Sequence, residues 1–334
     1  MMTIKLNGIV VYDEVLAPGP WQATFDIASI VTVGGVELEI VTPNSFVCIH
    51  ELSFIRHENG KNGVAFSRFP SGEQWFQHKD FLVGELVRNA ADIRQVNLIG
   101  GEPMLIEQCT DVVRHLVDSG HAPQMVLSVT TNGMVIPDGW LELASHFRQV
   151  TLTISLDGFG PVSEYIRFPS KWDQIYANIL RYKSLPNAYM LVNATIQTYN
   201  MLHVVDLIRF CDEIGIEFRY HFLIGPAHLS PLVMPKEVRM EAGQRVRQFA
   251  MRNDKTGASR STHVADRDAW LMQLAQAFEA EVPDWDTKKL RDFMIFTNDL
   301  DASRGQCFSD ALPELLSLIN KSGHSWDQTR RHAT

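Results

Sequence analysis

Polar residues follow several apolar runs of this 334-residue sequence, at the points where strands would end. In the segment GGEPM, residues 100–104, two glycines would let the backbone approach a ligand closely, and Pro103 would fix the turn. The carboxylate of Glu102 could bind a cation or an amine. The segment also fits an ordinary glycine turn, so on its own it does not establish a site.

Five further polar residues occupy similar places along the chain. Asn132 lies in TTNG, Ser155 and Asp157 lie in SLDG, Arg167 lies in EYIRF, and Thr195 lies in another apolar run. Ligands of parallel α/β proteins gather at the carboxyl ends of the strands, where loops converge. The repetition of polar residues at these ends therefore predicts one shared binding site.

The elements that must position these residues alternate between apolar runs and amphipathic segments. Six runs predict strands at residues 36–42, 95–100, 125–131, 150–156, 189–197 and 218–224. Helical patterns lie between them at residues 106–119, 139–147, 172–184 and 202–214. Because this order requires right-handed parallel crossovers, we expect an α/β fold with a partial (β/α)6 TIM-like barrel.

The two ends of the chain differ from this alternating middle part. Residues 1–34 are β-rich with turns, and residues 235–334 are helical in pattern. We therefore expect a β-rich N-terminal extension, a partial barrel over residues 35–234, and a helical C-terminal region.

Charge, apolar run length and cysteine spacing argue against several classes of partner and structure. The net charge of -9 argues against a nucleic-acid partner. No apolar run reaches membrane-spanning length and no secretory signal begins the sequence, so we expect a cytoplasmic protein without a membrane partner. The cysteines Cys48, Cys109, Cys211 and Cys307 lack pair spacing, which indicates reduced thiols.

The motifs together resemble the radical SAM superfamily, in particular its branch with twitch or SPASM-type extensions. The resemblance covers residues 36–225 and rests on three motifs: VNLIGGEPML, VTTNG, and TLTISLDG followed by YIR. The tail GQCFSDALPELLSLI is similar to the tails of twitch-containing members. The resemblance implies that the GGEP segment binds the amino group of S-adenosylmethionine, while later polar residues bind its ribose and carboxylate. The residues so implicated are Gly100, Gly101, Glu102, Pro103, Asn132, Ser155, Asp157, Arg167 and Thr195.

The CxxxCxxC motif of that family is missing from this sequence. In the family, three thiolates in the loop after the first strand hold a [4Fe–4S] cluster that reduces S-adenosylmethionine. The positions that align here are Phe46, His50 and Ser53. A phenyl ring, one imidazole and one hydroxyl cannot hold a four-iron cubane. We therefore predict that the cluster is absent.

Other ligand sets in the sequence are weaker. A shift of the alignment by two residues reaches Cys48 but places Leu52 and Ile55 at the other two positions. The remaining cysteines are scattered and fit buried thiols better than a substitute cluster. The donors His50, Glu51, His57 and Glu58 could suit a single metal ion, but a solvated polar loop is the interpretation we prefer.

Three functions remain open from the sequence. The first is a degenerate radical SAM protein, a pseudoenzyme that binds S-adenosylmethionine or a related nucleotide and acts as accessory subunit to an active paralogue, or to the peptide or protein which that paralogue modifies. The second is an enzyme that uses S-adenosylmethionine in polar chemistry, with His50 as general base. The third is a radical enzyme with unorthodox cluster ligation. We favour the first, because three metal ligands are absent while the polar residues at the strand ends remain.

Overall fold

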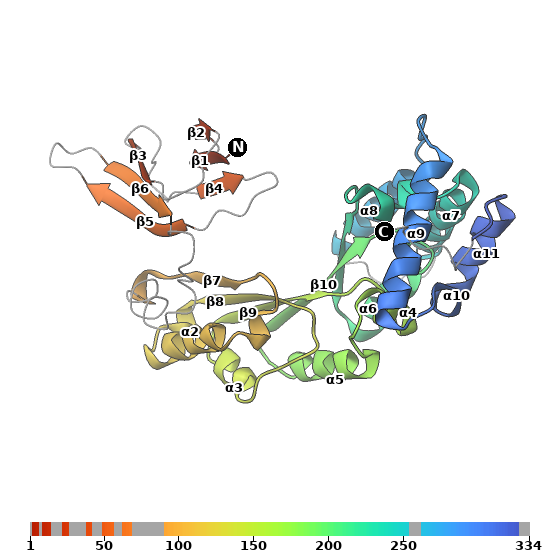
Figure 1. Ribbon diagram of the computed structural model, residues 1–334. Coiled ribbons are helices and arrows are strands. Elements are labelled where there is room, and N and C mark those ends of the chain that lie inside the picture. Colours follow the sequence, from red (N-terminus) through yellow and green to blue (C-terminus); the bar gives the residue numbers. More distant parts are fainter. Residues whose placement is uncertain are drawn as a thin grey trace. The chain divides into compact units, whose positions relative to one another are not determined.

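The computed structural model describes residues 90–253 and 262–326 and, before residue 90, the backbone of six strands. The chain divides into two compact units, Met1–Arg88 and Asn89–Thr334. Figure 1 labels the helices and strands of both units. The sequence-based division into three regions at residues 34 and 234 stays a prediction.

The first unit contains two antiparallel sheets of three strands each, in the orders β2-β1-β4 and β3-β6-β5. Their strands are β1 (Met2–Leu6), β2 (Ile9–Glu14), β3 (Gln22–Asp26), β4 (Leu38–Val41), β5 (Ile49–Arg56) and β6 (Asn62–Arg68).

Strand β4 corrects one expectation from the sequence. The run at residues 36–42 is not a strand of the parallel sheet, because Leu38–Val41 pairs antiparallel with β1. Its sequence Val-Glu-Leu-Glu-Ile alternates apolar and charged residues. Such alternation is typical of an antiparallel strand with one solvated face, whereas a parallel strand covered by helices is apolar throughout.

The second unit is built on a five-stranded parallel sheet in the order β11-β10-β9-β8-β7. Its strands are β7 (Gln95–Leu98), β8 (Val126–Thr131), β9 (Gln149–Ser155), β10 (Ala188–Ile196) and β11 (Glu217–Phe222). Because this order follows the chain without reversal, every crossover turns the same way, as in a partial barrel. The expected α/β fold is confirmed, with five parallel strands instead of six.

Helices α2 (Glu107–Asp118), α3 (Trp140–Ser145) and α5 (Trp172–Lys183) lie on the same side of this sheet (Figure 1). The other connecting helices are α4 (Pro161–Ile166) and α6 (Val204–Ile214). Helix α6 ends where the sequence predicts, at Gly215, whose φ of 66° is the left-handed conformation that glycine adopts without steric cost.

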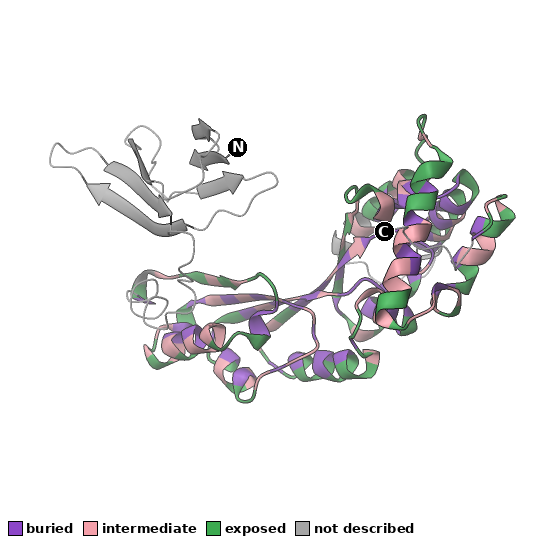
Figure 2. Cartoon of the chain, in the orientation of Figure 1, coloured by how far each residue is buried: buried purple, intermediate pink, exposed green. Residues whose placement is uncertain are grey.

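Burial alternates along the strands of the parallel sheet (Figure 2). Along β8 and β9 the apolar residues Leu127, Val129, Val150, Leu152 and Ile154 are fully buried. The residues between them are mostly hydroxyl-bearing and only half-buried: Ser128, Thr130, Thr151, Thr153 and Ser155. Because side chains alternate across a strand, one face packs in the core and the other presents hydroxyl groups.

Five helices follow the sheet: α7 (Lys236–Asn253), α8 (Thr262–Glu279), α9 (Thr287–Arg304), α10 (Phe308–Ala311) and α11 (Pro313–Lys321). None of the helices that the structure describes has the length and apolarity to cross a bilayer.

Aromatic packing joins α9 to the sheet. The Tyr199 ring, beyond the end of β10, lies 5.2 Å from that of Phe293 on α9 and 5.5 Å from that of Tyr165 on α4. The Tyr165 hydroxyl donates to Asp301, and the Tyr199 hydroxyl shares a hydrogen bond with Thr297. Helix α9 is therefore fixed beside the carboxyl ends of β9 and β10.

Candidate functional site

Glu102 joins the end of β7 to the end of β8. Its side chain is 9% exposed. Oε1 accepts hydrogen bonds from the Thr131 hydroxyl at 2.8 Å and from the Met104 N–H at 3.2 Å, and Oε2 accepts one from the Asn132 N–H at 2.7 Å. A buried carboxylate requires such donors, because an unpaired buried charge is costly.

The Glu102 carboxylate retains room for a ligand. An ionised carboxylate can accept about four hydrogen bonds. Three are used, two at Oε1 and one at Oε2, so the remaining acceptor position lies on Oε2. An ammonium or amine donor is the kind of group that this position can bind.

The loop before Glu102 contains two different glycines. Gly100 has φ 128°, a conformation that residues with a side chain rarely adopt. The backbone conformation alone therefore explains why glycine occupies position 100. Gly101 has no such strain, and a Cβ added there would meet nothing within 4 Å. The backbone and packing of the described residues do not require glycine at 101, which is consistent with close approach of a ligand. Pro103 is buried at the start of the short helical turn Pro103–Leu105.

Asn132 enters the site through its backbone. Its N–H binds Glu102, whereas its side-chain Oδ1 accepts the Met134 N–H at 2.9 Å and so holds the turn. Thr131, which the sequence interpretation did not single out, provides the hydroxyl bound to Glu102. It lies beside Asn132 in TTNG, and a hydroxyl at a strand end was the signal that could have identified it.

Asp157 forms the corresponding connection between β9 and β10, and it is 5% exposed. Its Oδ1 accepts the Thr195 N–H at 2.7 Å, and its Oδ2 lies 2.8 Å from Arg167 Nε. The Arg167 contact is an ion pair without hydrogen-bond geometry at Nε. The sequence therefore identified three residues, Asp157, Arg167 and Thr195, that the structure brings together.

Asn200 is a further member of this group that the sequence interpretation missed. Its side-chain amide donates to the Asp157 carbonyl at 2.7 Å and to the Thr195 carbonyl at 2.8 Å. Its Oδ1 accepts the Gln197 N–H at 2.8 Å. Only its position in the loop after β10 could have indicated this role.

Ser155 lies at the end of β9 on the hydroxyl-bearing face, in register with Asn193 of β10. Its side chain is half-buried and forms no hydrogen bond with any residue in the described part of the chain. The structure thus places two groups at one edge of the sheet, around Glu102 at β7 and β8 and around Asp157 at β9 and β10. Ser155 lies at the adjacent strand end.

The proposed catalytic residue, His50, belongs to the other unit. His50 and Ser53 both lie in strand β5, which corrects the expected loop, and Phe46 lies outside the described residues. The segment 49–55 contains apolar and aromatic residues that favour a strand, and it pairs with β6 with an irregularity between Ile49 and Glu51. His57 and Glu58 also lie outside the described residues.

The donor groups present do not fit a [4Fe–4S] cluster. Phenylalanine has no donor atom, and one imidazole and one alcohol cannot replace three thiolates. Three cysteines lie in separate places, Cys109 on α2, Cys211 on α6 and Cys307 just before α10. Burial raises the pKa of the Cys109 and Cys211 thiols, which disfavours the thiolate that binds metal. Within the described part of the chain no three His, Cys, Asp or Glu side chains are grouped for a metal ion.

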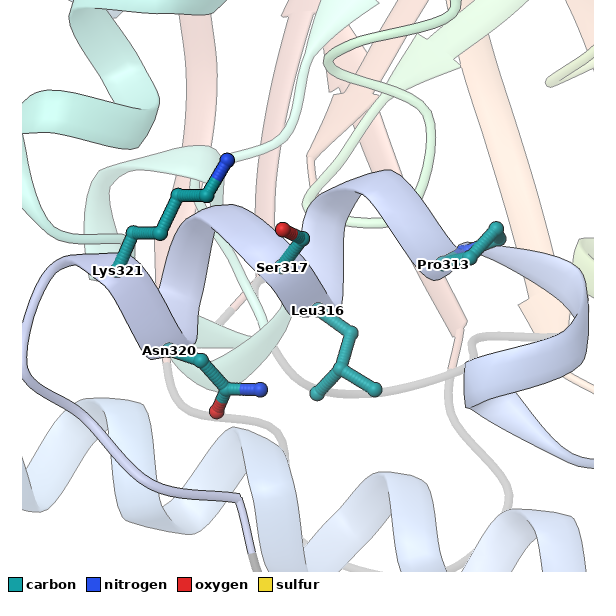
Figure 3. Close-up of a pocket in the computed structure, with 5 residues that line it drawn as sticks. All are labelled: Pro313, Leu316, Ser317, Asn320 and Lys321. Carbon is teal, nitrogen blue, oxygen red and sulfur yellow. The ribbon is translucent and has the colours of Figure 1, made fainter.

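Two hollows differ in their relation to this site. A cavity of about 320 Å³ is bordered by Asp157 and Arg167 together with residues of α9. A depression of about 460 Å³ lies along α11, and its described lining residues all belong to that helix: Pro313, Leu316, Ser317, Asn320 and Lys321 (Figure 3). The first hollow adjoins the polar strand ends, and the second shares no residue with them.

Comparison with known proteins gives local and distant similarities. No family model matches the chain. The chain is 34% identical to the GTP 3',8-cyclase of Rhodopirellula baltica over 87 residues, which are 26% of this chain and 23% of the cyclase. The chain thus matches less than a quarter of that relative's length.

Solved structures resemble the chain only distantly. Native anSMEcpe with bound AdoMet has a TM-score of 0.40 at 14% identity, covering 54% of this chain and 52% of that one. SuiB of Streptococcus suis bound to S-adenosylmethionine has a TM-score of 0.39 at 14% identity, covering 56% and 44%. Likeness at this level carries no information about the chemistry of the site.

Proposed function

We propose that this chain is a radical SAM-like protein without an iron–sulfur cluster, which binds S-adenosylmethionine or a related nucleotide at the strand ends of its parallel sheet. One observation carries the proposal: two buried carboxylates, Glu102 and Asp157, connect successive strand ends and each retains acceptor capacity. The sequence motifs around both residues and the local match to GTP 3',8-cyclase support it.

The polar residues at the strand ends match the chemical groups of a sulfonium nucleotide. Glu102 would accept the ligand amino group, and Gly101 would allow the backbone to approach it. Ser155 and Asp157 would hydrogen-bond the ribose hydroxyls, and the terminal nitrogens of Arg167 would bind the carboxylate. S-adenosylmethionine supplies an electrophilic sulfonium when bound. Its reductive cleavage needs an electron source that the donor groups of this chain do not provide.

An accessory role follows if the chain binds the nucleotide and lacks the iron–sulfur cluster. A protein that binds the nucleotide but lacks the electron donor cannot generate a radical alone. We propose that it acts with an active paralogue, or with the peptide or protein which that paralogue modifies. This part of the proposal rests on the selective loss of the three cluster ligands at positions 46, 50 and 53.

The test combines anaerobic reconstitution with iron and sulfide, absorption spectroscopy, and calorimetric titration of S-adenosylmethionine on the same sample. We expect no stoichiometric iron and a measurable affinity for the nucleotide. Glu102→Gln should weaken that affinity about tenfold or more, because it removes a charged acceptor. The exposed Glu142→Gln serves as a matched control on α3 and should leave the affinity unchanged.

Two results would refute the proposal. Stoichiometric iron and sulfide with production of 5′-deoxyadenosine would identify an active radical enzyme. No binding of S-adenosylmethionine or S-adenosylhomocysteine to the folded protein would remove the nucleotide site.

A further inference from the structure

The cavity beside Asp157 combines charged and apolar walls. On one side it is bordered by Arg167 of the loop after α4 and by Gln197 and Tyr199 of the loop after β10. On the other side it is bordered by Phe296, Leu300 and Arg304 of α9. Its volume of about 320 Å³ is that of a small-molecule site.

Two guanidinium groups border this cavity with donors to spare. Arg167 contacts Asp157 through Nε, and its terminal nitrogens donate to no other residue in the described part of the chain. Arg304 has no carboxylate within ion-pair distance among the described residues. Its contacts are the Tyr165 carbonyl, 3.5 Å from Nη1, and the Phe168 ring, whose centroid is 5.7 Å away.

Gln197 is the second, independent indication of a ligand. It is 8% exposed, and its side-chain amide forms no hydrogen bond with a described residue although it borders the cavity. Its amide atoms are not themselves fully buried, so they are reached from the cavity and are free to pair there. A ligand atom in the cavity would provide that partner.

The charges at the cavity indicate the ligand. Arg167 and Arg304 are cationic and Asp157 is anionic, so these three residues leave one positive charge. The neighbouring Asp301 accepts from the Tyr165 hydroxyl at 2.8 Å and the Phe308 N–H at 2.6 Å and also interacts electrostatically with Arg304, so it offsets part of that positive charge. A monoanion adds less negative charge beside Asp157 and Asp301 than a phosphate dianion would, so these carboxylates favour a monoanion.

We propose that this cavity binds a second ligand, a carboxylate attached to an apolar body, with Arg304 as the donor to the carboxylate and Gln197 as an additional partner. The apolar body would pack against Leu229, Phe296 and Leu300. The inference deepens the proposed function by naming a substrate class for the same strand-end site. A planar carboxylate matches the paired N–H groups of a guanidinium, which explains the use of arginine.

The test uses benzoate as the probe, titrated calorimetrically into the full-length protein. We expect saturable binding of benzoate and none of benzamide, which has the same shape without the charge. Arg304→Gln should weaken benzoate binding about tenfold or more, and Arg304→Lys should recover part of it. Arg114→Gln, an exposed arginine on α2, is the matched control and should have no effect.

Several results would overturn the inference. They are absence of benzoate binding, equal binding of benzamide, equal or tighter binding of phenylphosphonate, or an unchanged affinity in Arg304→Gln.

Titration of S-adenosylmethionine on the same variants separates the two proposals. A loss of nucleotide affinity in Arg304→Gln as large as that of benzoate would assign Arg304 to the nucleotide site instead. Failure of nucleotide binding with intact benzoate binding would refute only the proposed function.

Discussion

The carboxylates of Glu102 and Asp157 have a structural role in addition to their proposed role in ligand binding. Each is buried and bridges adjacent strand ends, so the sheet edge depends on the same side chains that the site would use. Burial with satisfied hydrogen bonds fixes both groups in position, which favours binding because no reorganisation is needed when a ligand arrives.

Gly101 allows the site to be tested without disturbing the fold. In Gly101→Ala the new methyl group meets no described atom within 4 Å, so we expect the free energy of unfolding to change by less than about 0.5 kcal/mol. If the nucleotide approaches the backbone closely, its affinity should fall about tenfold or more. Urea unfolding and nucleotide calorimetry measure the two effects. Unchanged affinity in the folded variant would show that the ligand does not contact residue 101.

At the scale of elements, α9 is attached to the sheet through a small number of buried contacts. Asp301 accepts hydrogen bonds from Tyr165 on α4 and from the backbone at the start of α10. These contacts hold Arg304, one turn further along α9, beside the strand ends. The geometry of the cavity therefore depends on how firmly this helix is anchored.

The pH dependence of stability should report on Asp301. Burial raises the pKa of its carboxyl group, against smaller opposing effects of Tyr165, Phe308 and Arg304. A raised pKa in the folded state means that the native protein binds more protons, so this contribution is present at low pH and is lost as pH rises through the folded pKa. Wild-type stability should therefore fall relative to Asp301→Asn as pH rises from about 4 towards neutrality. Urea unfolding across that range measures the difference, and a constant or opposite difference would contradict the assignment.

At the scale of the whole molecule, the chain consists of two compact units that meet in sequence between Arg88 and Asn89. Compact units of one chain unfold separately when few interactions couple them. The candidate site around Glu102 and Asp157 belongs to the second unit, whereas positions 46, 50 and 53 belong to the first.

Differential scanning calorimetry should therefore resolve two unfolding transitions. Phe293 is fully buried in the aromatic cluster of the second unit, and Phe293→Ala should destabilise that unit by about 3–5 kcal/mol. Only one transition should move to lower temperature in this variant. A single transition that shifts as a whole would show that the two units unfold together.

The sequence by itself predicted the five strands of the parallel sheet and singled out most of the residues of the candidate site. Apolar runs separated by amphipathic segments identified five strands and their helices, because burial under helices imposes a continuous apolar pattern that is local in the chain. Polar residues at the ends of these runs identified Glu102, Asp157 and Arg167 for a similar reason. The absence of cysteine at positions 46, 50 and 53 is likewise a property of the sequence alone.

Only the tertiary structure decided which strand pairs with which, and what encloses the site. The run at residues 36–42 has strand character in either sheet, and pairing with β1 fixed its place. Asn200 and α9 contribute to the site through contacts between residues distant in sequence. One example is the hydrogen bond between Tyr165 and Asp301, which are 136 positions apart. A hydrogen bond of this kind leaves no periodic pattern in the sequence, because its two partners are brought together only when the sheet and the C-terminal helices pack.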